Sequence, residues 1–276
     1  MEELTYLKSV LIGIFQGLTE FLPVSSSGHI MLLNECFNVN LEGDALGLFT
    51  VMLHLGTLLA VLIVYIKRVF NMIAHPVKSE LGLLVLATLP TVAYALALKA
   101  TGLDDVIDAG ARLILPFAFI FTGIILLFAG RIGKLRHKAG TAHKNIGVKD
   151  ALGMGLMQCI GTFSGVSRSG STITGGLLAG LNRKQAADFS FLMSIPAILG
   201  ALVLDAMDMH VSGIAAAFEG HWAIVGAGVL AAFIAGLAAI KIMLNAIKKL
   251  RFKWFSLYLF LLGAVIVVND YIVKIW

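Results

Sequence analysis

The side chains that could do chemistry stand in two short segments rich in serine and glycine. Glu20 and His29 flank the triplet Ser25–Ser27, and Arg168 stands inside the second segment, Gly165–Thr172. A guanidinium framed by hydroxyls and by the N–H groups of a starting helix is a combination that binds phosphate. A glutamate and a histidine can act as acid, base or metal ligand. These residues predict a site that binds an anion through Arg168 and acts on it through Glu20 and His29.

The two segments belong to an internal repeat. Gly13–His29 reads GIFQGLTEFLPVSSSGH, and Gly155–Ser171 reads GLMQCIGTFSGVSRSGS, which aligns with it at a constant offset of 142 residues. The identical positions include both glutamines, the first and last serines of the triplet and the glycine that follows it. An offset of about half the chain favours a duplication. The site should therefore take one half from each repeat.

The composition indicates a membrane protein. Of the 276 residues, 59% are hydrophobic and 13% are charged, and the mean hydropathy is +0.93, whereas a soluble domain carries about 25% charged residues. Apolar segments of membrane-spanning length occur at 46–66, 81–98, 111–130, 186–205, 222–243 and 254–272. We expect an all-α polytopic fold that forms a single integral membrane domain, 1–276, with one repeat at about 4–130 and the other at about 150–273.

The loop charges predict how the chain lies in the membrane. The net charge of +5 comes from loops at 67–78, 131–149 and 248–253, so the positive-inside rule explains it without a nucleic-acid partner. Acidic residues gather at 104–108 and 205–219, which should be external. The span at 46–66 then runs inward and its counterpart at 186–205 runs outward. The two repeats are therefore predicted to be inverted.

Each repeat begins with a broken apolar segment rather than a simple span. The first reads as a helix over 4–20, a stop at Pro23 and a short helix over 30–37, and the second as helices over 151–163 and 171–181. Each arm is too short to cross a bilayer comfortably. Broken backbone at membrane depth is tolerated only inside protein or against a water-filled cavity. We expect two re-entrant hairpins whose breaks meet at the midplane.

Three motifs carry a resemblance to a known family. Gln16-x-x-x-Glu20, Pro23–His29 and Gly165–Thr172 resemble the motifs of the undecaprenyl-diphosphate phosphatase (bacitracin resistance) family, and the similarity spans essentially the whole chain. It implies a multi-pass enzyme of the bacterial plasma (inner) membrane. This enzyme removes the terminal phosphate from a C55 isoprenoid diphosphate and recycles the carrier lipid for cell-wall synthesis, assisted by a divalent cation, Mg²⁺ or Ca²⁺.

The resemblance also assigns site residues by position. Its acidic motif falls on Gln16 and Glu20, its serine and histidine on Ser26 and His29, and its arginine motif on Gly165, Ser167, Arg168, Ser169 and Thr172. We predict that Glu20, Ser26, His29 and Arg168 are catalytic, with Glu20 also near the metal. The other motif residues should contact the diphosphate together with Ser25, Ser27 and Gly170. His54 and Gln158 are interpreted as structural or rim residues.

Two positions depart from the family pattern. Gln16 stands where many members have a glutamate, and Ser164 stands where a proline usually precedes the glycine of the arginine motif. Because glutamine does not titrate, Glu20 must carry the acid and base role of that motif alone. The nucleophile is either Ser26 activated by His29, or a water activated by Glu20 or His29.

The sequence leaves a second function and the oligomeric state open. Inverted repeats with broken helices are also a common architecture of transporters. The alternative function is therefore a transporter or flippase of a lipid phosphate or a small anion. A carrier needs Arg168 and the N–H groups but has less need of Glu20 with His29. The first hairpin should open outward, which predicts a site accessible from the external, periplasmic side. A homodimer is one option for the assembly.

Overall fold

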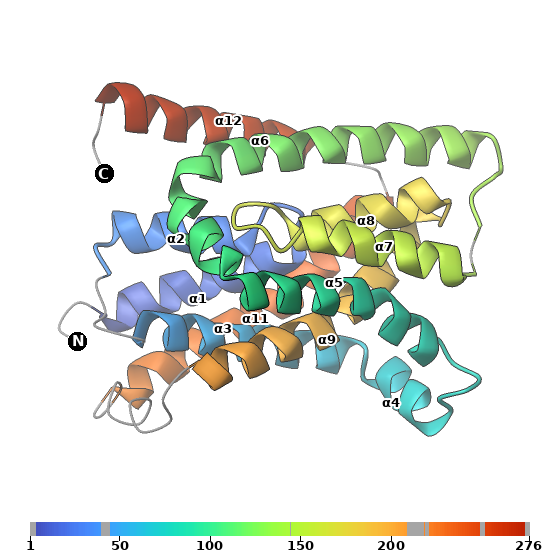
Figure 1. Cartoon of the computed structure of the whole chain (residues 1–276), viewed down its shortest axis with the longest axis horizontal. Helices are drawn as coiled ribbons and strands as arrows, with labels where there is room; N and C mark the ends of the chain where they lie inside the picture. Colours follow the sequence, from blue (N-terminus) through green and yellow to red (C-terminus); the bar gives the residue numbers. More distant parts are fainter. Residues whose placement is uncertain are drawn as a thin grey trace.

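The protein is helical throughout the part of the chain that its structure, a computed structural model, describes: residues 4–39, 45–143, 145–208, 218, 221–248 and 252–273. The first half forms α1 (Tyr6–Phe21), α2 (Ser26–Cys36), α3 (Ala45–Val64), α4 (Ile66–Ala74), α5 (Leu81–Thr101) and α6 (Leu103–Lys138). The second half forms α7 (Val148–Ile160), α8 (Arg168–Ala179), α9 (Arg183–Asp208), α11 (Trp222–Lys248), α12 (Phe252–Val268) and the short π-helix η1 (Asn269–Val273) (Figure 1). The expected all-α class is confirmed.

Five of these helices are long and apolar enough to cross a membrane: α3, α5, α6, α9 and α11. They correspond to the first five predicted spans. The sixth predicted span, 254–272, contains α12, which is apolar but has only 17 residues and continues into η1. Parts of the loops at 205–219 and 248–253, whose charges enter the predicted orientation, lie outside the described residues. The chain is thus a multi-pass membrane protein.

Both predicted helix breaks are present, and serine side chains set where the helices resume. Ser25 Oγ accepts from the N–H of Gly28 at 3.4 Å, and Ser167 Oγ accepts from the N–H of Gly170 at 3.1 Å. Each serine is therefore the N-cap of the helix that follows it. The caps start α2 and α8 earlier than the predicted 30–37 and 171–181. As a result, Ser26 and Arg168 are the first residues of their helices.

Each broken helix packs against a long helix of the other half of the chain. Helix α1 lies on α11, and α7 lies on α5. A Cβ at Gly13 would lie 2.2 Å from the carbonyl oxygen of Gly228, and a Cβ at Gly155 would lie 2.2 Å from that of Ala87. Only glycine permits such a close approach of two backbones. The repeated glycine therefore serves the same packing purpose in both halves.

A buried aromatic cluster supports the inner ends of the broken helices. Phe21, the last residue of α1, is 1% exposed and meets Phe191 of α9 edge to face, with ring centroids 5.8 Å apart. Phe119 of α6 is fully buried and packs against the His29 ring of α2. Burial of this apolar surface fixes the positions of α1 and α2, whose ends carry the predicted site residues.

Candidate active site

The two helix breaks contact each other directly. The N–H of Gly165 donates to Ser27 Oγ at 3.3 Å, and Ser169 Oγ donates to the carbonyl oxygen of Leu22 at 3.1 Å. Gly165 turns with a φ of +86°, where a Cβ would lie 2.8 Å from Leu115 and Ala118 side chains. The predicted composite site is therefore a contact between both repeats.

Glu20 is the centre of this contact. Its carboxylate pairs with the Arg168 guanidinium, accepts from Ser26 Oγ at 2.6 Å and accepts from Gln16 Nε2 at 3.1 Å. Glu20 is only 7% exposed. A buried charge is costly unless it is paired and hydrogen-bonded, and here Arg168 comes from the other half of the chain. The structure thus brings together four predicted site residues.

Two atoms of this cluster are buried without a partner in the described part of the chain. They are Gln16 Oε1, an acceptor, and Arg168 Nη1, a donor. Buried polar atoms are nearly always hydrogen-bonded, so an unpartnered pair beside a carboxylate marks a place for a ligand. The donor suits a phosphate oxygen, and the amide oxygen suits a cation or a hydroxyl.

His54 also lies at the carboxylate, which the sequence analysis did not predict. Its Nε2 is 3.7 Å from Glu20 Oε2, and its Nδ1 bonds the carbonyl oxygen of Thr50 at 2.9 Å. Because a carbonyl can only accept, Nδ1 carries a hydrogen and Nε2 faces Glu20. The signal in the sequence was a single ionisable residue in the middle of the apolar span 46–66.

His29 is bound by other residues than Glu20. Its Nδ1 lies 2.6 Å from the carbonyl oxygen of Ser25, and its Nε2 lies 2.6 Å from the hydroxyl of Tyr258. The ring is 4% exposed and stacks on Tyr258 with centroids 5.7 Å apart. Both ring nitrogens therefore have protein partners, Nδ1 as donor and Nε2 as acceptor. The structure does not bring His29 to the Glu20 carboxylate.

The remaining predicted residues mostly hold the two breaks in shape. Ser25 and Ser27 lie 3.3 Å apart between their Oγ atoms, and the pair Ser167 and Ser169 lies 3.2 Å apart in the same way. Thr172 is fully buried, and its Oγ1 lies 2.6 Å from Ser190 Oγ of α9. Gly170 is the residue whose N–H the Ser167 cap binds. Thr172 thus ties α8 to α9 rather than facing the Glu20 carboxylate.

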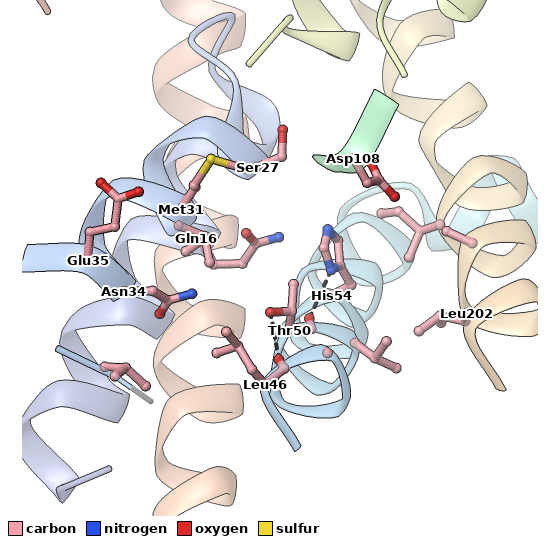
Figure 2. A pocket seen from close by; sticks show the side chains of 16 residues that line it. Gln16, Ser27, Met31, Asn34, Glu35, Leu46, Thr50, His54, Asp108 and Leu202 are labelled. Carbon is pink, nitrogen blue, oxygen red and sulfur yellow. Dashed lines mark hydrogen bonds between the residues drawn. The ribbon is translucent and has the colours of Figure 1, made fainter. Parts of the chain in front are cut away.

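Two cavities meet at this cluster. A cavity of about 260 Å³ is lined by Glu20, Ser26 and Arg168 together with His54 and the serines of both breaks. A second cavity of about 850 Å³ shares Ser27, His54, Ile198 and Ala201 with the first. Figure 2 shows Gln16 and His54 reaching into the larger cavity from opposite sides. Its walls are largely apolar, with Met31, Leu46 and Leu202 among them (Figure 2).

An ion-pair cluster fixes the rim of the larger cavity. Arg112 of α6 donates to Glu35 of α2 at 2.6 Å and to both carboxylate oxygens of Asp270 in η1 at 2.8 and 2.9 Å. The cluster joins the end of α2 to two other helices, so the helix whose first residue is Ser26 is anchored at its far end.

The geometry is that of a site for a molecule with a charged head and an apolar body. Comparison with known proteins agrees with this interpretation of the site. Residues 9–265 match the family model described as bacitracin resistance protein BacA. The chain belongs to this family. The resemblance that the three sequence motifs suggested is therefore confirmed.

Several curated proteins are similar to this chain over nearly its full length. The undecaprenyl-diphosphatase of Carboxydothermus hydrogenoformans is 39% identical over 264 residues, covering 95% of this chain and 96% of that protein. Undecaprenyl-diphosphatase 4 of Bacillus thuringiensis is 37% identical over 269 residues, covering 97% and 98%. The undecaprenyl-diphosphatase of Alkaliphilus metalliredigens is 35% identical over 284 residues, covering 96% and 98%. Each match therefore covers nearly the whole of both chains.

Proposed function

We propose that this protein is an undecaprenyl-diphosphate phosphatase. It hydrolyses undecaprenyl diphosphate to undecaprenyl phosphate and inorganic phosphate, and so returns the carrier lipid to cell-wall synthesis. The observation that carries the proposal is the cluster of Glu20, Ser26 and Arg168, which combines a buried carboxylate, a hydroxyl and a guanidinium where two cavities meet. The names of the BacA relatives support the same activity.

The site offers donors for both phosphates of the head group. Arg168 Nη1 is buried and has no partner in the described chain, so it is available as a charge-assisted donor. The first turns of α2 and α8 add N–H groups at a helix N-terminus. The apolar walls of the larger cavity, including Met31 and Leu202, then take the part of the prenyl chain nearest the diphosphate.

Glu20 is placed to activate Ser26 as the nucleophile. Ser26 Oγ already donates its hydrogen to Glu20 Oε2 at 2.6 Å, while both nitrogens of His29 are occupied. Glu20 takes the proton as Ser26 Oγ bonds to the terminal phosphorus, and the bond from that phosphorus to the bridging oxygen breaks. Undecaprenyl phosphate leaves, and water then hydrolyses the phosphoserine. Arg168 stabilises the charge on the transferred group, which is the main requirement of phosphoryl transfer.

The donor set fits a hard divalent cation. Among the described residues, no group of three or more His, Cys, Asp or Glu side chains is arranged to hold a metal ion, but Mg²⁺ commonly binds through one carboxylate and the substrate phosphates. Glu20 and the unpartnered Gln16 Oε1 would hold Mg²⁺ or Ca²⁺. The ion would neutralise charge on the diphosphate.

We further propose that the halves are inverted repeats with re-entrant hairpins in the bacterial inner membrane. The matched serine caps and matched glycine contacts of the two halves support this. In Figure 1, α1 approaches the centre of the molecule from the left and α7 approaches it from the right. The larger cavity is lined by Leu46 and Asp108, near the starts of α3 and α6. Because the acidic segment 104–108, at the start of α6, is predicted to be external, the site should open to the periplasm.

The test is phosphate release from undecaprenyl diphosphate by the purified protein, with and without EDTA. We expect the unmodified protein to release phosphate. Arg168→Ala should lower the rate of release by at least about 100-fold, because charge-assisted bonds to the phosphate are lost. Ser171→Ala is the matched control, because Ser171 is buried one turn further along α8 and its hydroxyl has no partner in the described chain. Folded protein that binds the lipid but releases no phosphate would instead support the carrier alternative.

A further inference from the structure

A separate cavity lies between α6 and α12, which run side by side (Figure 1). It has a volume of about 300 Å³. Its lining combines three cations with apolar side chains: Arg131, Lys134 and Lys253, and Leu127, Phe128 and Phe252. None of its lining residues belongs to the two cavities at Glu20. It therefore needs an explanation of its own.

The three cations have no acidic partner among the described residues. Arg131 and Lys134 are three residues apart on α6 and so share one face of the helix. Lys253 is the second residue of α12, and its Nζ lies 4.9 Å from the ring centroid of Trp254. None of the ion pairs among the described residues involves any of the three, and the lining contains no carboxylate. Three positive charges on one cavity favour an anionic ligand.

The apolar part of the lining continues from the cations along α6. Phe128 is 60% exposed and Leu127 is 39% exposed on the outside of a membrane-spanning helix. Gly130 also lines the groove, between these side chains and the cations, and a Cβ there would make an ordinary contact with Phe252 at 3.5 Å. Trp254, which is 58% exposed, marks the level of the membrane interface. A charged end and an apolar groove at that level match a phospholipid, with its phosphate at the cations and an acyl chain along α6.

We propose that this groove is a binding site for an anionic phospholipid of the surrounding bilayer. Its phosphate lies among Arg131, Lys134 and Lys253, and one acyl chain packs on Leu127 and Phe128. Three cations without a carboxylate select a lipid with net negative charge, such as phosphatidylglycerol, over a zwitterionic one, whose amine they repel. The proposal does not depend on the phosphatase activity.

The test is native mass spectrometry of the delipidated full-length protein, titrated with phosphatidylglycerol and with phosphatidylcholine of the same acyl chains. We expect phosphatidylglycerol to bind at least about tenfold more tightly. Each cation near an anionic head group contributes about fivefold in affinity. The triple variant Arg131→Gln, Lys134→Gln and Lys253→Gln should therefore lose about 100-fold in affinity for phosphatidylglycerol.

The matched control removes three exposed cations that lie outside the groove, Lys67, Lys78 and Lys138, by the same change to glutamine. Its affinity should stay within about twofold of the unmodified protein. Gly130→Leu keeps all three charges but fills the groove, so it should weaken both lipids. Equal affinity for the two lipids, or equal losses in the triple variant and its control, would overturn the proposal. If the triple variant does not fold, unchanged phosphatidylglycerol binding by Gly130→Leu overturns it.

Discussion

Replacing Ser26 by alanine separates two roles that the structure allows for this residue. Its hydroxyl donates to Glu20 Oε2 at 2.6 Å, so it either attacks the phosphorus or only orients the carboxylate. The substitution removes a single oxygen at a half-buried position. It leaves the Ser25 cap and the Arg168 pair with Glu20 in place.

The two roles predict losses of different size. A hydrogen bond to a charged group contributes about 1.5–3 kcal/mol, which corresponds to a factor of about 10 to 150 in rate. Loss of a covalent nucleophile costs far more, at least about 1,000-fold in kcat. Because Arg168 still binds the phosphate, KM should change much less than kcat. We expect the kcat of Ser26→Ala to fall by at least about 1,000-fold.

The assay is single-turnover phosphate release from radiolabelled undecaprenyl diphosphate, with rapid quenching to trap a phosphoenzyme. We expect label on the unmodified protein, none on Ser26→Ala, and labelling retained by the control Ser171→Ala. A Ser26→Ala variant that keeps about a tenth to a hundredth of the normal kcat would refute the reasoning, because a residue that only orients Glu20 accounts for such a loss. Water would then be the nucleophile.

Three further outcomes follow from the same site. Gln16→Glu places a second carboxylate beside Glu20, and the like-charge repulsion should lower the Tm measured in EDTA. Mg²⁺ should then raise the Tm of this variant more than that of the unmodified protein. An equal rise of Tm with Mg²⁺ in both proteins would contradict this cation site. His54→Gln removes a partly exposed ionic contact with Glu20, so kcat in the phosphate-release assay should fall by up to about fivefold, and a much larger loss would make His54 a catalytic residue. Tyr258→Phe removes the donor to the buried His29 and should cost about 1–3 kcal/mol of stability in thermal unfolding with phosphate release retained. If the folded Tyr258→Phe variant releases no phosphate, His29 would be a catalytic residue after all.

The local features of the site could be predicted because short-range rules produce them. Pro23 ends a helix, and a serine ahead of a glycine caps the next one, whatever the rest of the chain does. Both breaks therefore follow from the sequence, and their contact follows from the offset between the two copies. Helices α2 and α8 begin at Ser26 and Arg168, earlier than the apolar pattern predicts, because the caps Ser25 and Ser167 start them ahead of the apolar runs.

The partners of the two histidines could not be predicted, since packing between distant helices decides them. His54 reaches Glu20 because α3 packs against both α1 and α9. Tyr258 reaches His29 across 229 residues of chain, and no local pattern marks that contact. A histidine two residues after a serine triplet suggested a catalytic pair, yet one helical turn places its ring on Ser25 and Tyr258 instead.

The pairing of Glu20 with Arg168 links the assembly of the two halves to the chemistry. Either residue alone would be a buried, uncompensated charge, so the halves stabilise each other through the residues that we propose bind the substrate. A diphosphate that enters competes with Glu20 for the guanidinium. As Arg168 turns toward phosphate, its ion pair with Glu20 weakens while the hydrogen bond from Ser26 to Glu20 remains. Substrate binding should thus leave Glu20 bonded to Ser26 when a phosphate is present to be attacked.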